Sequence, residues 1–239
     1  MRIITTMGIE HRAQGHRRAC LHLAGLVWLG LAAPAAADGI GNEHAPPQEI
    51  CGTCHGLDGI SRMAKFPKLA GQRPDYLERQ IRDFREGRRS NDGGQMAAIV
   101  TEISEEQIAE VAAHFASQPP PVPSAVRVEV SGEDRAARLY SAGDPQAGIE
   151  PCRSCHTSGA RPAGSVAARA PLLGAQHEGY VAKQLADFRA GTRDNDAGGE
   201  MRTIAAKLSD ADIAALARFI SAMPREAAAM TRSPTCTGC

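Results

Sequence analysis

Apolar side chains recur at helical spacing in several segments of this 239-residue chain. In residues 74–87 the apolar residues that would share one helical face are Tyr76, Leu77, Ile81 and Phe84. Proline suits the first position of a helix and glycine suits its end, so Pro74 and Gly87 predict the bounds of this helix. The pattern therefore predicts an amphipathic helix that packs one face against a core.

A second helix is predicted at residues 104–115, and a similar sequence recurs at residues 209–220. Ser104 and Gln107 have the spacing of a capping box, in which each side chain binds the other residue's backbone N–H. The apolar stripe of this helix is Ile108, Val111, Ala112 and Phe115. A further helix is predicted at residues 133–143. Because no segment alternates apolar and polar residues as a half-buried strand does, we expect an all-α protein.

An apolar run at residues 21–33 follows two arginines and precedes the small residues Ala35 and Ala37. These are the three parts of a secretory signal peptide, so residues 1–37 are predicted to be one, cleaved near Ala37. The alternative is a membrane anchor, for which the run is short, since roughly 20 apolar residues are needed to span a bilayer. We therefore expect the mature chain in the periplasm, an oxidising compartment.

The chain contains an internal repeat, residues 67–96 and residues 171–201. The residues that match at an offset of 104 are Pro67/Pro171, Gln72/Gln176, Tyr76/Tyr180, Gln80/Gln184, Asp83/Asp187, Phe84/Phe188, Gly87/Gly191 and Asn91/Asn195. Met96 and Met201 then match at an offset of 105. Differences in length confined to loops are typical of a duplicated domain.

Four prolines in residues 118–124 separate the two repeats and favour an extended spacer. The predicted organisation is a signal peptide at 1–37, a first domain at 38–118, a Pro-rich linker at 119–124, a second domain at 125–225 and a C-terminal tail at 226–239.

Each repeat begins with the pentapeptide Cys-x-x-Cys-His, at residues 51–55 and 152–156. A structural zinc site needs a second cysteine pair about 15–20 residues away, and neither repeat contains one. A thioredoxin-like dithiol needs a βαβ context, which the chain lacks. A covalent haem uses every residue of the motif, because the two thiols form thioethers and the histidine binds iron. The motif therefore favours two haems over zinc or dithiol chemistry.

The haem hypothesis assigns a role to specific residues in each repeat. The thioether cysteines would be Cys51, Cys54, Cys152 and Cys155, and the proximal iron ligands would be His55 and His156. Met96 and Met201 are the predicted sixth ligands, because both follow a glycine-bearing loop and both recur; the alternative is flexible core filler. Met63 and Met223 lack counterparts and are interpreted as filler. His114 and His177 are rival ligands that do not recur.

A proximal histidine needs a backbone carbonyl that accepts the hydrogen bond of its second ring nitrogen. Pro67 and Pro171 recur in the two repeats and could present such a carbonyl rigidly. The alternative is that each is a simple turn proline.

The order of these motifs resembles the cytochrome c4 family, which are dihaem class I c-type cytochromes. After Cys-x-x-Cys-His come FPKLAGQ at residues 66–72, the tyrosine-to-glycine helix, the methionine and the capped final helix. The resemblance covers about residues 49–118 and 133–224. It implies two tandem class I cytochrome c domains about a pseudo-two-fold axis, each with one covalent haem held by histidine and methionine, and prolines that accept the histidine N–H.

The resemblance also implies an electron carrier, not an enzyme, between a quinol-oxidising bc complex and a terminal oxidase or similar acceptor. The alternatives are a cytochrome subunit of a periplasmic dehydrogenase and a dihaem peroxidase-like enzyme. Residues 38–118 have 9 basic and 13 acidic side chains, whereas residues 124–239 have 14 and 13, so the two ends could orient toward different redox partners. No basic patch indicates nucleic acid. Peripheral association with the membrane is kept as an alternative.

The sequence departs from the family pattern in two places. Pro46 and Pro47 are expected to shorten the N-terminal helix of the first domain and to leave its haem more exposed. In the tail, Cys236 and Cys239 form a third Cys-x-x-Cys without a histidine. This pair is interpreted as a disulfide or labile thiol pair, a truncated haem motif or a metal site, and no third haem is predicted.

Overall fold

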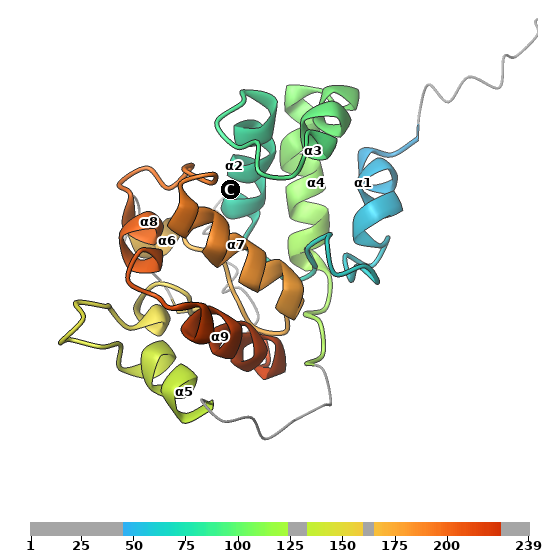
Figure 1. The fold of residues 1–239 in the computed structure, drawn as a ribbon. Helices are drawn as coiled ribbons and strands as arrows, with labels where there is room; N and C mark the ends of the chain where they lie inside the picture. The colour runs from blue at the N-terminus through green and yellow to red at the C-terminus, as the bar shows by residue number, and fades with distance from the viewer. Residues whose placement is uncertain (1–44, 124–132, 160–164, 226–239) are drawn as a thin grey trace, which may run out of the picture. The chain divides into compact units, whose positions relative to one another are not determined.

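The computed structural model describes residues 45–123, 133–159 and 165–225, which form helices joined by loops (Figure 1). The predicted signal peptide and the tail with Cys236 and Cys239 lie outside the described residues. The elements are α1 (Pro47–His55), α2 (Pro74–Arg85), α3 (Gln95–Ile99), η1 (Val100–Glu102), α4 (Glu105–Ser117), α5 (Glu133–Ser141), η2 (Cys152–Ser154), α6 (Val166–Arg169), α7 (Glu178–Ala190), α8 (Glu200–Ala205) and α9 (Asp210–Ala222). Extended pairing in these ranges is limited to one bridge, Asp144 to Ile149, so the all-α prediction is confirmed.

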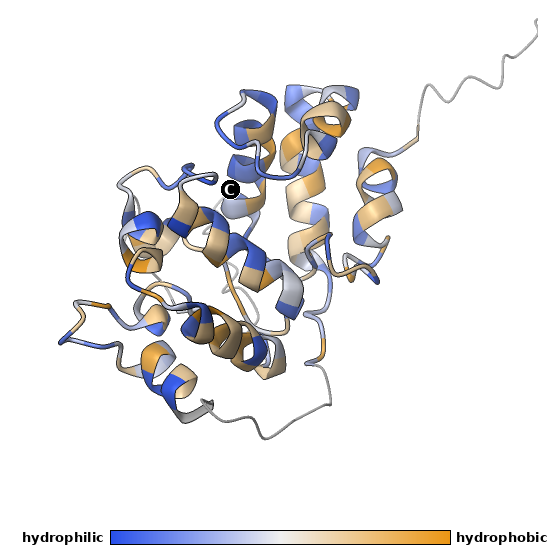
Figure 2. Cartoon of the chain, viewed as in Figure 1, coloured by the Kyte–Doolittle hydropathy of each residue, from blue (hydrophilic) through white to orange (hydrophobic). Residues whose placement is uncertain are grey.

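Each repeat builds its own core around a pair of long helices. In the first repeat α2 and α1 both pack against α4, and in the second α7 and α5 both pack against α9. Hydrophobic and hydrophilic residues alternate along these helices, as Figure 2 shows for α2, α4, α7 and α9. Burial of the apolar stripe is therefore what holds each pair together. None of the helices in the described ranges is long and apolar enough to cross a bilayer.

The two cores contain the apolar stripes that the sequence predicted. The first core consists of Leu77, Ile81, Phe84, Val100, Ile103, Ile108, Val111, Ala112 and Phe115. The second consists of Ala136, Leu139, Ile149, Val181, Leu208, Ile213, Ala215, Leu216, Ala217 and Ile220. Phe115 is fully buried, whereas the second core fills much of its space with alanine and leucine.

The predicted helix ends agree closely with the structure. α2 begins at Pro74, and Gly87 follows the helix with a left-handed φ of 73°. Gly191 plays the same part after α7, also with a φ of 73°. Ser104 caps α4 with Gln107, and Ser209 caps α9 with an aspartate, each in a complete capping box.

Two prolines set the start of the helix that leads into the first motif. Pro46 and Pro47 do not interrupt a helix: Pro46 is the N-cap of α1, and Pro47 is its first residue. Proline is tolerated there because the N–H it lacks has no partner within the helix. Only four residues of α1 precede Cys51, whereas all nine residues of α5 precede the second motif, so the helix before the first motif is the shorter one, as expected.

Candidate haem-binding sites

The first Cys-x-x-Cys-His motif occupies the C-terminal half of α1. His55 ends the helix four residues after Cys51, so helical spacing places both on one face. The histidine ring is buried, at 5% exposure, and its Nδ1 lies 2.8 Å from the carbonyl oxygen of Pro67. Burial lowers the pKa of His55, which favours the neutral ring. With Nδ1 hydrogen-bonded to a carbonyl, Nε2 is the nitrogen that can bind a metal.

The second motif reaches the same hydrogen bond through a different backbone. Cys152–Ser154 form the 3₁₀ turn η2, and ten residues separate the end of α5 from this turn. Nδ1 of His156 again lies 2.8 Å from a proline carbonyl, that of Pro171. Both repeats therefore hold the histidine ring through the same hydrogen bond, although one motif is α-helical and the other is not.

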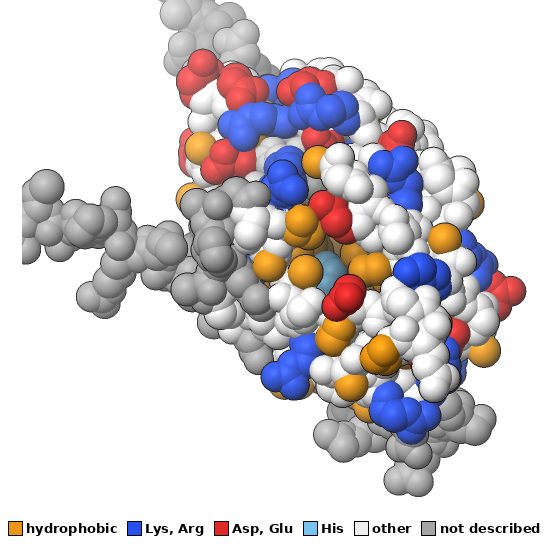
Figure 3. All heavy atoms as spheres, turned by 90° about the vertical axis from the view of Figure 1, so that its left-hand side faces the viewer, with side chains coloured by type: hydrophobic (Ala, Val, Ile, Leu, Met, Phe, Trp, Pro, Cys, Tyr) orange, Lys and Arg blue, Asp and Glu red, His pale blue; other side chains and the backbone are white. Residues whose placement is uncertain are grey.

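A small hollow of about 30 Å³, partly open to solvent, lies beside the second histidine. Its lining is Tyr140, His156, Leu172, Leu173, Gly174, Met223 and Pro224. Figure 3 shows a hollow of this kind, in which a histidine ring is surrounded by hydrophobic side chains. The side chains of Leu172, Leu173 and Met223 beside a metal-binding nitrogen suit the edge of an apolar cofactor whose iron that nitrogen would bind.

The first cysteine of each motif has the properties of a half-buried thiol and not of a redox nucleophile. Cys51, Cys54, Cys152 and Cys155 are all free thiols. Burial raises the pKa of Cys51 to about 11 and that of Cys152 to about 11. Reactive dithiols instead have a lowered pKa. No group of three or more His, Cys, Asp or Glu side chains suited to a metal ion occurs in the described part of the chain. The residues present thus fit covalent haem better than a dithiol or a zinc cluster.

The two predicted methionine ligands occupy equivalent positions. Met96 is the second residue of α3 and Met201 the second of α8, and each helix follows a left-handed glycine, Gly94 or Gly199. Met96 also packs against the first core. Of the methionines without counterparts, Met63 is 53% exposed, whereas Met223 lines the hollow beside His156. The role of Met96 and Met201 as ligands stays a prediction.

The rival histidines make protein contacts. His177 precedes α7, and its Nε2 lies 3.0 Å from the carbonyl oxygen of Ser61 in the other repeat. The ring of His114 packs edge-on against Phe115.

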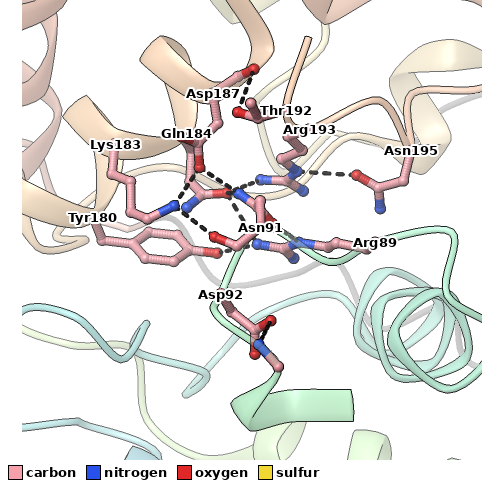
Figure 4. A network of polar contacts seen from close by, with 11 residues as sticks. Arg89, Asn91, Asp92, Tyr180, Lys183, Gln184, Asp187, Thr192, Arg193 and Asn195 are labelled. Atoms are coloured by element: carbon pink, nitrogen blue, oxygen red, sulfur yellow. Dashed lines mark hydrogen bonds and ion pairs between the residues drawn. The ribbon is translucent and has the colours of Figure 1, made fainter. Parts of the chain in front are cut away.

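Two arginines that the sequence analysis did not single out are central to the contact between the repeats (Figure 4). Arg89 donates from Nη1 to Gln80 (2.7 Å) and from Nη2 to Gln184 of the other repeat (3.0 Å). Arg193 mirrors this, donating to Gln184 (2.7 Å) and to Gln80 (3.1 Å). The hydroxyl oxygen of Tyr180 accepts a further hydrogen bond from Nη2 of Arg89 (3.0 Å). The offset of 104 between the two arginines was the signal that could have identified them.

Asparagines and aspartates extend this pseudo-symmetric network. Asn91 donates to Asp187 across the interface (2.6 Å), and Asn195 donates to Asp83 (2.7 Å). Lys183 reaches back to the carbonyl oxygen of Asn91. The reciprocity of these bonds explains why the same polar residues recur in both repeats.

Comparison with known proteins agrees with this geometry. Residues 135–224 match the family model described as cytochrome c, and residues 47–115 match that of cytochrome c oxidase, cbb3-type, subunit III. Cytochrome c4 of Pseudomonas aeruginosa is 40% identical over 200 residues, which are 83% of this chain and 96% of the relative. The chain belongs to the cytochrome c4 family. Its dihaem c-type architecture, with two cytochrome c domains, follows from that membership.

A solved structure and a further relative are also similar to this cytochrome c4 family member. The crystal structure of reduced recombinant cytochrome c4 from Pseudomonas stutzeri superposes with a TM-score of 0.63 at 36% identity, and covers 74% of this chain and 96% of that one. A thiosulfate dehydrogenase electron acceptor of Stutzerimonas stutzeri is 36% identical over 74% of this chain and 80% of the relative. The chain is thus a cytochrome c4-like electron carrier.

Proposed function

We propose that each domain holds one covalent haem c and that the protein passes single electrons between periplasmic redox proteins. The observation that supports this most directly is the bond from the Nδ1 atoms of His55 and His156 to the carbonyls of Pro67 and Pro171. Such a bond orients the ring, fixes its tautomer and raises the basicity of Nε2. Both domains repeat it, although their motifs have different backbones.

Four residues in each domain would hold its haem. Cys51 and Cys54 in the first domain, with Cys152 and Cys155 in the second, would form the thioethers. His55 and His156 would supply the proximal nitrogen, and Met96 and Met201 the opposite thioether sulfur. When bound, each haem supplies an iron that changes between the ferric and ferrous states. With a histidine nitrogen and a methionine sulfur both bound to each iron, no position would remain for substrate, which would suit outer-sphere transfer and not catalysis.

The partners are proposed from charge and from relatives. Residues 38–118 have 13 acidic against 9 basic side chains, and residues 124–239 have 13 against 14, so the two domains would favour different contact surfaces. The donor would be a quinol-oxidising bc complex or a similar respiratory donor, and the acceptor a terminal oxidase. Rates of transfer with such partners should fall as salt rises; rates independent of salt with both would contradict the charge argument.

A periplasmic dehydrogenase is the second candidate donor. It is favoured by the relative named as a thiosulfate dehydrogenase electron acceptor, which spans most of this chain. The chemistry within this protein would be unchanged, but the partner would be an enzyme. Reduction of the purified cytochrome by thiosulfate plus such a dehydrogenase, at a rate that saturates with cytochrome, would support this candidate. A lack of reduction under conditions where the bc complex does reduce it would exclude it.

Intact mass of the denatured protein, secreted by a host that attaches haem, tests the proposal. We expect a chain that begins near Asp38 and carries the mass of two haems. A chain without haem would overturn the proposal, and a third haem would show that Cys236 and Cys239 form a working site. A chain that keeps residues 1–37 would contradict the periplasmic assignment. Unchanged spectra of the haem-loaded protein with carbon monoxide and with peroxide would exclude the peroxidase alternative.

A further inference from the structure

Two buried glutamines cross the domain interface and bind the backbone beside the proline carbonyls. Gln176 of the second domain accepts from the N–H of Lys68 at Oε1 (2.9 Å) and donates from Nε2 to the carbonyl of Lys68 (3.0 Å). Gln72 of the first domain makes the same pair with Leu172, at 2.8 Å and 2.9 Å. Both side chains are buried, at 7% and 4% exposure. Each amide therefore uses its donor and its acceptor on one residue of the other domain.

The peptide groups involved are those that also hold the histidines. The N–H of Lys68 and the carbonyl of Pro67 belong to one peptide unit, and that carbonyl accepts from His55. In the same way the N–H of Leu172 shares a peptide unit with the carbonyl of Pro171, which accepts from His156. A continuous chain of hydrogen bonds thus runs from each proximal histidine, through one peptide unit, to a glutamine of the opposite domain.

Hydrogen bonds in such chains polarise one another, by perhaps 10–30% per bond. An amide whose N–H is bound to a good acceptor has more negative charge on its oxygen, so this oxygen accepts more strongly. A stronger acceptor at Nδ1 makes the imidazole more basic at Nε2 and stabilises the higher oxidation state of a bound iron. Loss of the glutamine should therefore favour the reduced iron.

We infer that Gln176 and Gln72 are positioning residues that act across the interface, each tuning the reduction potential of the haem in the opposite domain. The inference rests on the proposed attachment of two haems. It assigns Gln176 to the first haem and Gln72 to the second, so the crossed assignment is its distinguishing feature. A residue that only stabilised its own domain would affect its own haem.

The orientation of the two amides is well determined by their neighbours. Oε1 of Gln176 also accepts from the N–H of His177, and Oε1 of Gln72 also accepts from the N–H of Arg73 (both 3.0 Å). With two N–H groups facing it, this atom has to be the oxygen, and the amide nitrogen has to face the carbonyl.

Arg225 makes the first domain the better place to test the inference. Its buried guanidinium donates from Nη1 to the carbonyls of Lys68 (3.3 Å) and Ala70 (2.8 Å), and from Nε to that of Gly174 (3.0 Å). These bonds should hold the backbone of residues 68–70 in place when Gln176 is replaced. The change at His55 would then reflect the lost acceptor and not a displaced loop.

The experiment compares Gln176→Met with Gln72→Met in the haem-loaded protein. Redox titration followed by NMR resolves the two haems, and the proton on Nδ1 of each histidine reports its own hydrogen bond. We expect Gln176→Met to raise the potential of the first haem, to weaken the bond of His55 and to leave the second haem unchanged. Gln72→Met should do the reverse. Gln176→Glu keeps an acceptor for Lys68 and adds negative charge, so it should lower the potential of the first haem.

Lys183→Gln is the matched control, because it removes an interdomain bond to the carbonyl of Asn91 and leaves both proline peptides untouched. Loss of its positive charge would lower a potential and so cannot imitate the rise expected for Gln176→Met. The inference is overturned if Gln176→Met moves neither haem or only the second, or if Gln176→Met and Gln176→Glu shift the potential alike. A protein without a haem spectrum would instead overturn the proposed function.

Discussion

The two haem domains reach one histidine geometry from different local structures. In the first domain the motif is helical, His55 is 5% exposed, and Phe115 is fully buried in the core. In the second the motif lies on a 3₁₀ turn, and a hollow partly open to solvent adjoins the histidine. The shared feature is the 2.8 Å bond to a proline carbonyl. Duplication has thus kept the contact that controls the ligand and let the surrounding backbone vary.

The expectation that the first haem is the more exposed one is not supported at the histidine. Pro46 and Pro47 limit the helix before Cys51 to four residues, yet the histidine that ends this helix is well covered. His55 is buried, whereas His156 is only half-buried. The domain with the longer helix before its motif is therefore the one with the more exposed histidine.

The largest expected effect is loss of one haem from one domain. Replacing Cys51 and Cys54 by serine should remove one haem mass, and replacing Cys152 and Cys155 should remove the other. Because each domain has its own core, the remaining haem should keep its spectrum. Intact mass and absorption spectra check this. The Cys236→Ser, Cys239→Ser protein is the control and should keep both haems; loss of haem there would give the tail a role in attachment.

The next comparison tests which methionine completes each iron site. Met201→Ala should open the second iron, so that carbon monoxide binds to the reduced protein. Met96→Ala should do the same for the first. Met223→Ala is the matched control, because Met223 lines the hollow beside His156 yet lacks a counterpart in the first domain. If Met223→Ala opens the iron and Met201→Ala does not, the repeat pattern has identified the wrong ligand.

The next expected effect is on the free energy of unfolding, and its size should differ between the two cores. Phe115 is fully buried, so Phe115→Ala should lower the free energy of unfolding by roughly 3–5 kcal/mol through lost contacts and a new cavity. Ile220→Val removes one methylene at the corresponding position of α9 and should cost about 0.5–1.5 kcal/mol. Urea unfolding of the haem-loaded protein measures both values. Val122→Ala, at an 82% exposed position, should change stability by no more than roughly 0.5 kcal/mol.

The smallest expected effect is the loss of stability at the start of α9 as pH falls. The side chain of Arg135 lowers the pKa of Asp212, which completes the capping box of α9 with Ser209. A carboxylate with a lowered pKa stabilises the fold above its ordinary pKa, and this contribution is lost as pH falls through the lowered value. The equivalent residue of α4 is the neutral Gln107. Hydrogen exchange should therefore show the start of α9 opening in acid before the start of α4, and Asp212→Asn should remove this difference in pH dependence.

Much of the fold could be predicted because it depends on local chemistry. Helical periodicity, Pro74 at a helix start and the capping box of Ser104 and Gln107 all act within one or two turns. The haem motif was equally local, since its reactive residues lie within five positions. The prolines were identified because they recur. Arg89 and Arg193 recur too, but a charged side chain on a polar segment gave no reason to expect burial at an interface.

The sequence by itself determined the family and the all-helical repeats, and it predicted the residues that would hold each haem. Only the tertiary structure decided which backbone groups the buried side chains bind. The bonds from Gln72 to Leu172 and from Gln176 to Lys68 join an amide to main-chain atoms about 100 residues away. Nearly every residue has the same backbone N–H and carbonyl. The residue type at a position therefore does not indicate which side chain its backbone binds. The open hollow beside His156 was undetermined for the same reason, since it depends on how α9 and the segment of Leu172 pack together.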